Sequence, residues 1–191
     1  MLSLTINDYK ILRDNQCSLQ ETSKDTSEME SKGSDKVRYL TFCKKHVVDF
    51  DKVKTAFMKS LGIPENMIEV KSVDALVLED KFFFIEFKNG NARKEKTDVL
   101  IKAKDSMTIL NSILKLQVED ARKNYVFILV YNKDEVVYTD KEKIAKTHAR
   151  KGKEPYVLFE LGRMKGFNFK EVYTLNQDEF QEQIIEELGW G

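Results

Sequence analysis

Two acidic residues and a lysine occupy the most apolar part of the chain. Asp74 precedes a short apolar run, and Glu86 and Lys88 end a run of aromatic and β-branched residues that begins at Phe82. Alternate side chains of a strand point to the same face, so Glu86 and Lys88 should lie together. Charges on an otherwise apolar strand are costly to bury unless they find partners or a metal. If Asp74 faces the same spot from a neighbouring strand, two carboxylates and one ammonium group converge there.

Such a group of side chains suits metal-assisted cleavage of phosphodiester bonds. Mg²⁺ takes oxygen ligands and is usually held by one or two carboxylates together with water and phosphate oxygens. The metal polarises the phosphate and lowers the pKa of a bound water. A nearby lysine can orient that water or stabilise the charge that develops in the transition state. These residue types therefore predict a hydrolytic site at Asp74, Glu86 and Lys88.

Asp74 and the tripeptide Glu86-Phe87-Lys88 form a pattern that resembles the signature of the PD-(D/E)xK nuclease superfamily, with Val73 where the signature has proline. The resemblance implies a restriction-endonuclease-like αβββαβ core. It also implies that Asp74, Glu86 and Lys88 are catalytic, and that Asp74, Glu86 and the carbonyl of Phe87 hold a Mg²⁺ or Mn²⁺ ion. Lys88 would position or activate the attacking water. The implied partner is nucleic acid, more usually DNA, and a homodimer stays open because many enzymes of this superfamily are dimers.

The segments around this motif set its place in the fold. Val73–Leu78 and Phe82–Lys88 are expected to form a hairpin of two strands, and apolar residues at helical spacing predict a helix on each side of it. Asp49 is a candidate N-cap, and Gly62 a stop signal, for the first of these helices. The expected order is helix 49–61, strand 67–71, hairpin strands 73–78 and 82–88, helix 93–116 and strand 124–132. The nuclease superfamily is built on the same αβββαβ order.

The chain as a whole is expected to be an α/β protein with a mixed sheet flanked by helices. Asn124–Asn132 is apolar almost throughout, which is typical of a strand buried on both faces. Residues 1–36 are expected to form an N-terminal arm and a flexible linker, because 13–36 holds almost no large apolar residue. Residues 37–191 would form a single nuclease-like domain, which begins with a strand over 37–43. Its C-terminal α/β extension would contain helices over 140–153 and 156–165, a strand over 167–175, and a last helix capped by Asn176 and Glu179 with Leu188 facing inward.

The charge balance limits how the chain could bind nucleic acid. It carries 32 basic and 32 acidic residues, so its net charge is zero and any contact with phosphates has to come from a local patch. Charge runs are usually solvated faces, so the alternative is that these residues bind nothing. The candidate contacts lie at the start of helix 93–116 and in helix 140–153: Arg93, Lys94, Lys96, Lys146, Arg150 and Lys151.

Several other classes of protein are disfavoured by the sequence. Cys17 and Cys43 form no redox or metal motif, and the two histidines lack partners at ligand spacing, so a zinc site is not expected. No apolar run has the length of a membrane span, and the first residues lack the pattern of a secretory signal. We therefore expect a cytoplasmic protein with no membrane partner.

Two rival interpretations stay open. One is a catalytically inactive module on the same fold that binds protein or nucleic acid, which the zero net charge favours. The other is a structural protein in which the hairpin charges merely pair, so that Glu86 and Lys88 would be exposed and distant from Asp74. The sequence also does not decide whether a further acid, Glu69 or an aspartate at the start of helix 49–61, belongs to the site.

Overall fold

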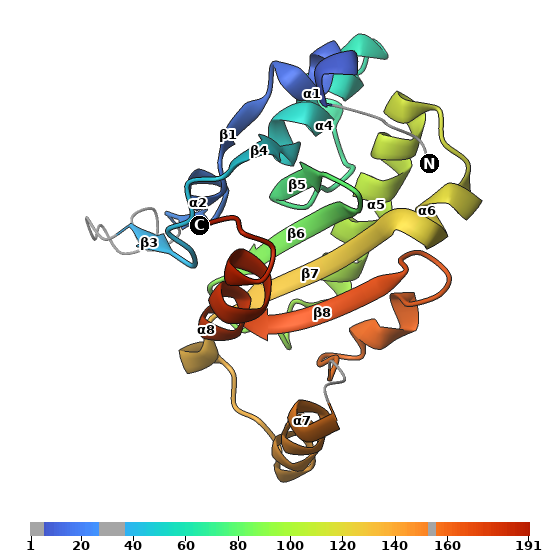
Figure 1. The fold of residues 1–191 in the computed structure, drawn as a ribbon. Helices are drawn as coiled ribbons and strands as arrows, with labels where there is room; N and C mark the ends of the chain where they lie inside the picture. Colours follow the sequence, from blue (N-terminus) through green and yellow to red (C-terminus); the bar gives the residue numbers. More distant parts are fainter. Residues whose placement is uncertain (1–5, 27–36, 153–155) are drawn as a thin grey trace.

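A mixed sheet of six strands forms the centre of the molecule. The computed structural model describes residues 6–26, 37–152 and 156–191, and the strands lie in the order β1-β4-β5-β6-β7-β8 (Figure 1). The bounds are β1 Gln16–Ser18, β4 His46–Asp49, β5 Ala75–Leu78, β6 Phe82–Lys88, β7 Tyr125–Tyr131 and β8 Glu171–Asn176. Pairing is antiparallel from β1 to β6 and parallel from β6 to β8. The expected α/β class, with a mixed sheet flanked by helices, is confirmed.

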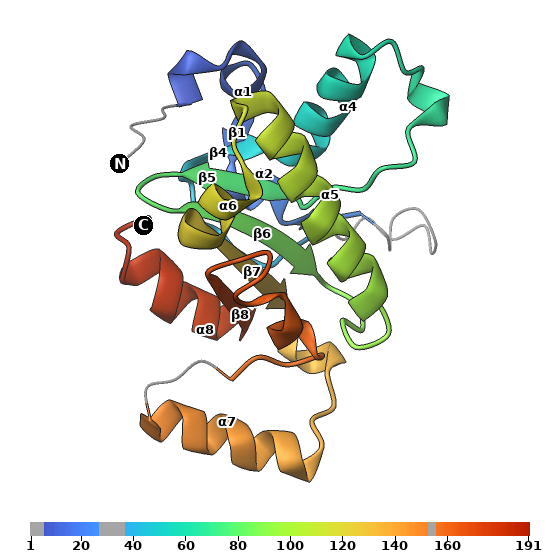
Figure 2. The same cartoon turned by 90° about the vertical axis from the view of Figure 1, so that its right-hand side faces the viewer.

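Helices surround this sheet (Figures 1 and 2). The helical segments are η1 Ile6–Asp8, α1 Lys10–Arg13, α2 Leu19–Thr22, α4 Phe50–Ser60, η2 Glu65–Met67, α5 Lys96–Leu114, α6 Val118–Asn124, η3 Lys133–Glu135, α7 Asp140–Gly152, η4 Leu161–Met164, α8 Gln177–Phe180 and the π-helical η5 Gln181–Glu186. A separate antiparallel pair consists of β2 Lys24–Asp25 and β3 Arg38–Tyr39. Within the described ranges, no helix is long and apolar enough to cross a membrane.

The two faces of the sheet bury different helices. Helices α4 and α5 pack on one face, and α2, α8 and η5 pack on the other. Successive side chains of a strand alternate between these faces, so Phe82 and Phe84 of β6 join the α5 side while Phe83 and Ile85 join the α8 side. The same alternation places the side chains of Glu86 and Lys88, at the polar end of β6, on the α5 side of the sheet. Strand β7 is buried over all seven residues, as its apolar sequence predicts.

Helix α4 follows the predicted signals closely. The Asp49 side chain accepts a hydrogen bond from the Lys52 backbone N–H at 3.1 Å and so caps the helix. Phe50 and Val53 are fully buried on its inner face. The chain leaves the helix through Gly62, whose φ of 79° is readily adopted only without a β-carbon.

One expected strand is wrong, and with it the expected order of elements. Residues 67–71 form no strand, because Glu65–Met67 is a 3₁₀ turn and Met67 is 65% exposed on the surface. The strand that pairs with β5 is instead β4, which precedes helix α4. Its buried Val47 and Val48 supply one residue to each face of the sheet. The core order is therefore strand, helix, strand, strand, helix, strand rather than αβββαβ.

The N-terminal region is more ordered than its composition predicts. Gln16–Ser18 pairs with β4 as an edge strand, and Leu12 and Leu19 are fully buried. A linker over 13–36 is therefore wrong for these residues, because a few apolar side chains anchor an otherwise polar segment. Residues 1–5 and 27–36 of the expected arm and linker lie outside the described part. Of the strand expected over 37–43, only Arg38–Tyr39 forms, in the separate pair with β2.

The C-terminal extension matches the prediction in part. Helix α7 and the strand β8 form, and Asn176 and Glu179 make the predicted capping box at the start of α8. The helix expected over 156–165 is wrong, since only the 3₁₀ turn η4 is present there. Leu188 is 43% exposed rather than inward, whereas Trp190 is buried with 4% exposure.

Candidate active site

The register of the β5–β6 hairpin places the two acids side by side. Ala75 pairs with Ile85, and the Asp74 N–H donates to the carbonyl of Ile85 at 3.1 Å, so Asp74 and Glu86 are opposite each other at the end of the ladder. Directly opposed side chains of an antiparallel pair lie on the same face. One oxygen of Asp74, Oδ2, accepts the Phe87 backbone N–H at 2.6 Å, which fixes the carboxylate against β6. The structure thus brings together the two carboxylates that the motif singled out.

Two lysines bind these carboxylates. Lys102 reaches down from α5 and places its Nζ 2.7 Å from Glu86 Oε1 and 3.7 Å from Asp74 Oδ1. Lys88 Nζ lies 3.3 Å from the same Glu86 oxygen. Lys88 is shared more widely, because its Nζ also lies 2.7 Å from Glu95 Oε2 and 3.3 Å from an Asp98 oxygen. The end of the hairpin is therefore a compact cluster of opposite charges rather than a scattered set.

Glu86 is the most constrained member of the cluster. Its side chain has no exposed surface, yet its Oε2 has no hydrogen-bond partner among the described residues. Buried carboxylate oxygens are normally satisfied, and leaving one without a partner costs about 1–3 kcal/mol or more. A cation beside Asp74 would supply the missing partner. The donor set, two hard carboxylate oxygens, matches what Mg²⁺ and Mn²⁺ accept, so the residues present fit such an ion.

Burial shifts the acids of this cluster toward their neutral forms. It raises the pKa of Glu86 from 4.5 to about 8, with the neighbouring Asp74 adding to the effect and the two lysines opposing it. It raises the pKa of Asp74 from 3.8 to about 6, against Lys102 and the Phe87 N–H. Burial would lower the pKa of Lys88, but its acidic partners Glu86, Glu95 and Asp98 outweigh burial and raise it. Perturbed acids in one cluster are typical of functional sites, though ion-pair networks produce them too.

Hydrogen bonds from α5 hold the entry to β5 in place. Ser106 Oγ accepts the Val73 N–H at 2.8 Å, and Asp105 accepts the Lys71 N–H at 2.9 Å. Asp98 pairs with the Lys71 side chain as well as with Lys88. Since α5 also carries Lys102, the same helix positions the strand that bears Asp74 and the lysine that binds it.

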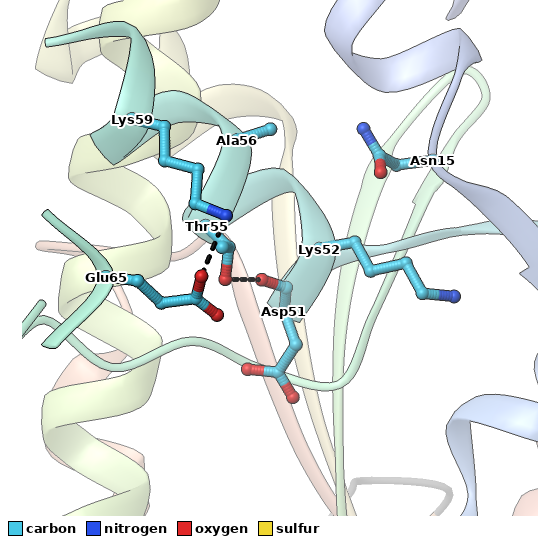
Figure 3. Close-up of a pocket in the computed structure, with 7 residues that line it drawn as sticks. All are labelled: Asn15, Asp51, Lys52, Thr55, Ala56, Lys59 and Glu65. Carbon is cyan, nitrogen blue, oxygen red and sulfur yellow. Dashed lines mark hydrogen bonds and ion pairs between the residues drawn. The ribbon is translucent and has the colours of Figure 1, made fainter. Parts of the chain in front are cut away.

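A shallow hollow lies along α4. It has a volume of about 450 Å³ and is lined by Asn15, Asp51, Lys52, Thr55, Ala56, Lys59 and Glu65 (Figure 3). The Asp51 carboxylate points away from the Lys59–Glu65 ion pair in this view, and it binds Ser72 and Lys54. Its charge helps to raise the pKa of Asp74. The hollow itself contains none of the motif residues.

Three of the six expected nucleic-acid contacts are paired with acids. Arg93 binds both oxygens of Glu142, at 2.9 and 2.8 Å, and Lys96 pairs with Glu160 at 3.0 Å. Lys146 is held at 2.9 Å by a Glu179 oxygen and at 3.0 Å by a tyrosine hydroxyl.

Of the other three expected contacts, Lys94 is exposed in the turn that precedes α5, and the side chains of Arg150 and Lys151 lie outside the described part. A basic patch built from all six residues thus finds no support in the described side chains.

Lys102 is a site residue that the sequence motif does not include. Asp98 and Lys102 stand four residues apart in α5, a spacing at which side chains can pair along a helix, but each binds a residue of strand β6 instead. The sequence feature that could have pointed to Lys102 is its position next to the apolar stripe of α5, between the buried Val99 and Ala103. Among the described residues, no three His, Cys, Asp or Glu side chains form a cluster that could hold a metal, so a cation here would rest on the two carboxylates and backbone or solvent oxygens.

Comparison of the chain with models of known protein families, with characterised proteins and with solved structures gives no match. Function therefore has to be inferred from the fold class and from the chemistry of the residues themselves. The arrangement offers two adjacent carboxylates, Glu86 fully buried and Asp74 partly buried, with one unsatisfied oxygen and two ammonium groups at the end of a strand. Such a set can hold a divalent cation and stabilise negative charge next to it.

Proposed function

We propose that the protein is a metal-dependent nuclease of the PD-(D/E)xK type, which hydrolyses phosphodiester bonds of nucleic acid with DNA as the first substrate to test. Asp74 and Glu86 would hold a Mg²⁺ or Mn²⁺ ion together with the carbonyl of Phe87. Lys88 would position or activate the attacking water. The ion and the catalytic roles are parts of this proposal; the αβββαβ order of the superfamily is not, because β4 precedes α4.

The observation that carries the proposal is the unsatisfied Oε2 of the fully buried Glu86 beside Asp74. A carboxylate that served only as a structural ion-pair partner would gain most by satisfying both oxygens. Here one oxygen binds lysine and the other binds nothing among the described residues. A site that receives a cation would have such an oxygen left for it.

The side chains have separable roles in this scheme. A bound Mg²⁺ would supply Lewis acidity to the scissile phosphate and to the attacking water. Asp74 is held in place by the Phe87 N–H, and Glu86 by its burial on β6, so the two ligands need little rearrangement. The Lys88 ammonium, positively charged because its pKa is raised, would orient the water and stabilise charge that develops on the phosphate.

The direct experiment is a cleavage assay on supercoiled plasmid, single-stranded DNA and RNA, each with Mg²⁺, Mn²⁺ or EDTA. The wild type should cut at least one substrate only when the metal is present. Asp74→Asn and Lys88→Met should lower the rate by a hundredfold or more, as loss of an active-site charge typically does. Lys104→Met, which changes an exposed lysine on α5, is the matched control and should cut normally. Cleavage that persists in the Asp74→Asn, Lys88→Met double variant would remove the assignment.

A catalytically inactive module that binds protein or nucleic acid is the second candidate. The observation in its favour is that Lys102 already forms ion pairs with both carboxylates, as it could in a site that has lost its metal. The two candidates differ in metal binding. Calorimetric titration with Mg²⁺ and Mn²⁺ that gives no heat, together with no cleavage of any substrate, would favour the binding module.

A further inference from the structure

Lys102 occupies the place between the two candidate ligands. Its Nζ lies 2.7 Å from Glu86 Oε1 and 3.7 Å from Asp74 Oδ1, so a single ammonium group bridges the carboxylates of two strands. Lys88 differs, because it divides its charge among Glu86, Glu95 and Asp98. Within the described residues, the ion pairs of Lys102 are those with Asp74 and Glu86. Its side chain is 20% exposed, so these pairs are only weakly screened by water.

We propose that Lys102 is a resident counter-ion of the site, which holds Asp74 and Glu86 together before metal arrives and has to be displaced by a divalent cation. The inference rests on the metal site of the proposed function but not on cleavage itself. Two carboxylates on adjacent strands repel each other, and the ammonium offsets that repulsion. A divalent ion on Glu86 Oε2 and an Asp74 oxygen would stand next to the Lys102 ammonium, a like charge bound to the same two carboxylates. The cation and the ammonium therefore compete for the same pair of carboxylates.

The lysine side chain is suited to such an exchange. Its four-carbon stem is flexible, and its charge is a compact point that needs no fixed geometry. The stem starts from α5, at the partly exposed border of the buried stripe, so the ammonium can turn toward solvent while the helix stays in place. Once released, it would face a phosphate bound to the cation. Lys102 would then favour substrate binding after having opposed metal binding.

The test is a calorimetric titration of the wild type and of Lys102 variants with Mn²⁺ in the absence of nucleic acid. Lys102→Met and Lys102→Gln remove the charge, so each should bind Mn²⁺ roughly tenfold more tightly, the order expected when one competing charge is lost at a partly buried site. Lys104→Met should bind as the wild type does. Unchanged or weaker binding in both Lys102 variants overturns the proposal.

A second measurement uses the wild type alone and so does not depend on how the variants fold. Acetylation of lysines by an amine-reactive ester, followed by mass spectrometry, reports how accessible each ammonium is. Saturating Mg²⁺ should raise the acetylation rate of Lys102 several-fold and leave that of Lys104 unchanged. A Lys102 rate that stays equal or falls, with Mn²⁺ or Mg²⁺ shown to bind, contradicts the displacement.

Failure of this inference can be told apart from failure of the proposed function. Metal-dependent cleavage by a protein whose Lys102 variants gain no affinity would retain the nuclease and remove the counter-ion. Tighter Mn²⁺ binding in the variants of a protein that cuts nothing would retain the counter-ion and favour the inactive module. Absence of Mn²⁺ binding in the wild type and in every variant would overturn both.

Discussion

The substitution Glu86→Gln tests whether the Glu86 carboxylate stabilises the fold or serves as a ligand at some cost in stability. If Glu86 were an ordinary ion-pair partner, its neutral replacement would destabilise the protein. Burial instead raises its pKa from 4.5 to about 8, so the folded state keeps a proton on Glu86 at pH values where the unfolded chain has lost it. The stability that this proton contributes is full below pH 4.5 and is lost as the pH rises toward 8. The Gln side chain has no such proton to lose.

The size of the expected stability change follows from the pH interval between the unfolded-state and folded-state pKa values of Glu86. Each pH unit between the two pKa values is worth about 1.4 kcal/mol, so the span from pH 5 to pH 8 sets an upper value of about 4 kcal/mol. Lys88 and Lys102 stabilise the carboxylate and lie within reach to readjust, which lowers the expected value to about 2 kcal/mol. Relative to the wild type, Glu86→Gln should therefore gain about 2 kcal/mol between pH 5 and pH 8. The variant should at the same time lose metal binding.

The assay is urea unfolding at pH 5 and pH 8 in EDTA, with the free energy of unfolding compared at each pH. Glu95→Gln is the control, because Glu95 also binds Lys88 but is 41% exposed, and its variant should show no such gain. A Glu86→Gln variant whose stability relative to wild type is equal or lower at pH 8 would refute the reasoning. The Glu86 carboxylate would then be a stabilising ion, and the case for an open ligand position would fail with it.

Three further variants test the surroundings of the site. Asp49→Ala should cost about 1 kcal/mol in urea unfolding, because it removes the N-cap of α4, and should leave the Mn²⁺ affinity unchanged; a loss of affinity would contradict this. Trp190→Ala should cost about 3 kcal/mol by the same assay, since the ring is 4% exposed; a loss below 1 kcal/mol would show that the C-terminal packing is not as described. If DNA binds, Lys94→Ala should lower the salt dependence of its affinity by about one counter-ion, whereas Lys146→Ala should leave that slope unchanged because Glu179 already neutralises Lys146; the reverse result would reassign the contact.

The sequence predicted the core of the fold where a pattern was strong and local. Strand β7 was evident from an unbroken apolar run, and α4 from the cap at Asp49 and the turn at Gly62. The capping box of Asn176 was likewise complete within four residues. Each of these signals depends on neighbours in the chain. Tertiary contacts therefore did not alter them.

The strand wrongly expected over 67–71 shows what local sequence patterns do not predict. Residues 67–71 and His46–Asp49 are both short, and each has only a few apolar side chains. Which of them enters the sheet depends on pairing with β5, and pairing between distant segments is not encoded in local spacing. The N-terminal strand β1 was missed for the same reason. Its three residues acquire strand structure from β4.

In the candidate site, too, the residues that a local pattern marks were predicted, and those placed by tertiary contacts were not. The sequence placed Glu86 and Lys88 on one face of their strand but left open whether Asp74 faces the same spot, and the register of the hairpin puts it there. Lys102 could not be found in this way, because its place depends on how α5 crosses the sheet. The expected basic contacts failed for a related reason. Arg93 and Lys146 meet acids that are 49 and 33 residues away in the chain.

The most direct measurement of the central claim is anomalous diffraction from crystals soaked in Mn²⁺. The proposal predicts one peak between Asp74 and Glu86, about 2.2 Å from an oxygen of each carboxylate, a distance typical of hard divalent ions on oxygen ligands. Glu86 Oε2 should be one of the two ligands. Crystals in millimolar Mn²⁺ with no peak at this pair, and with Lys102 still bridging both carboxylates, would contradict it.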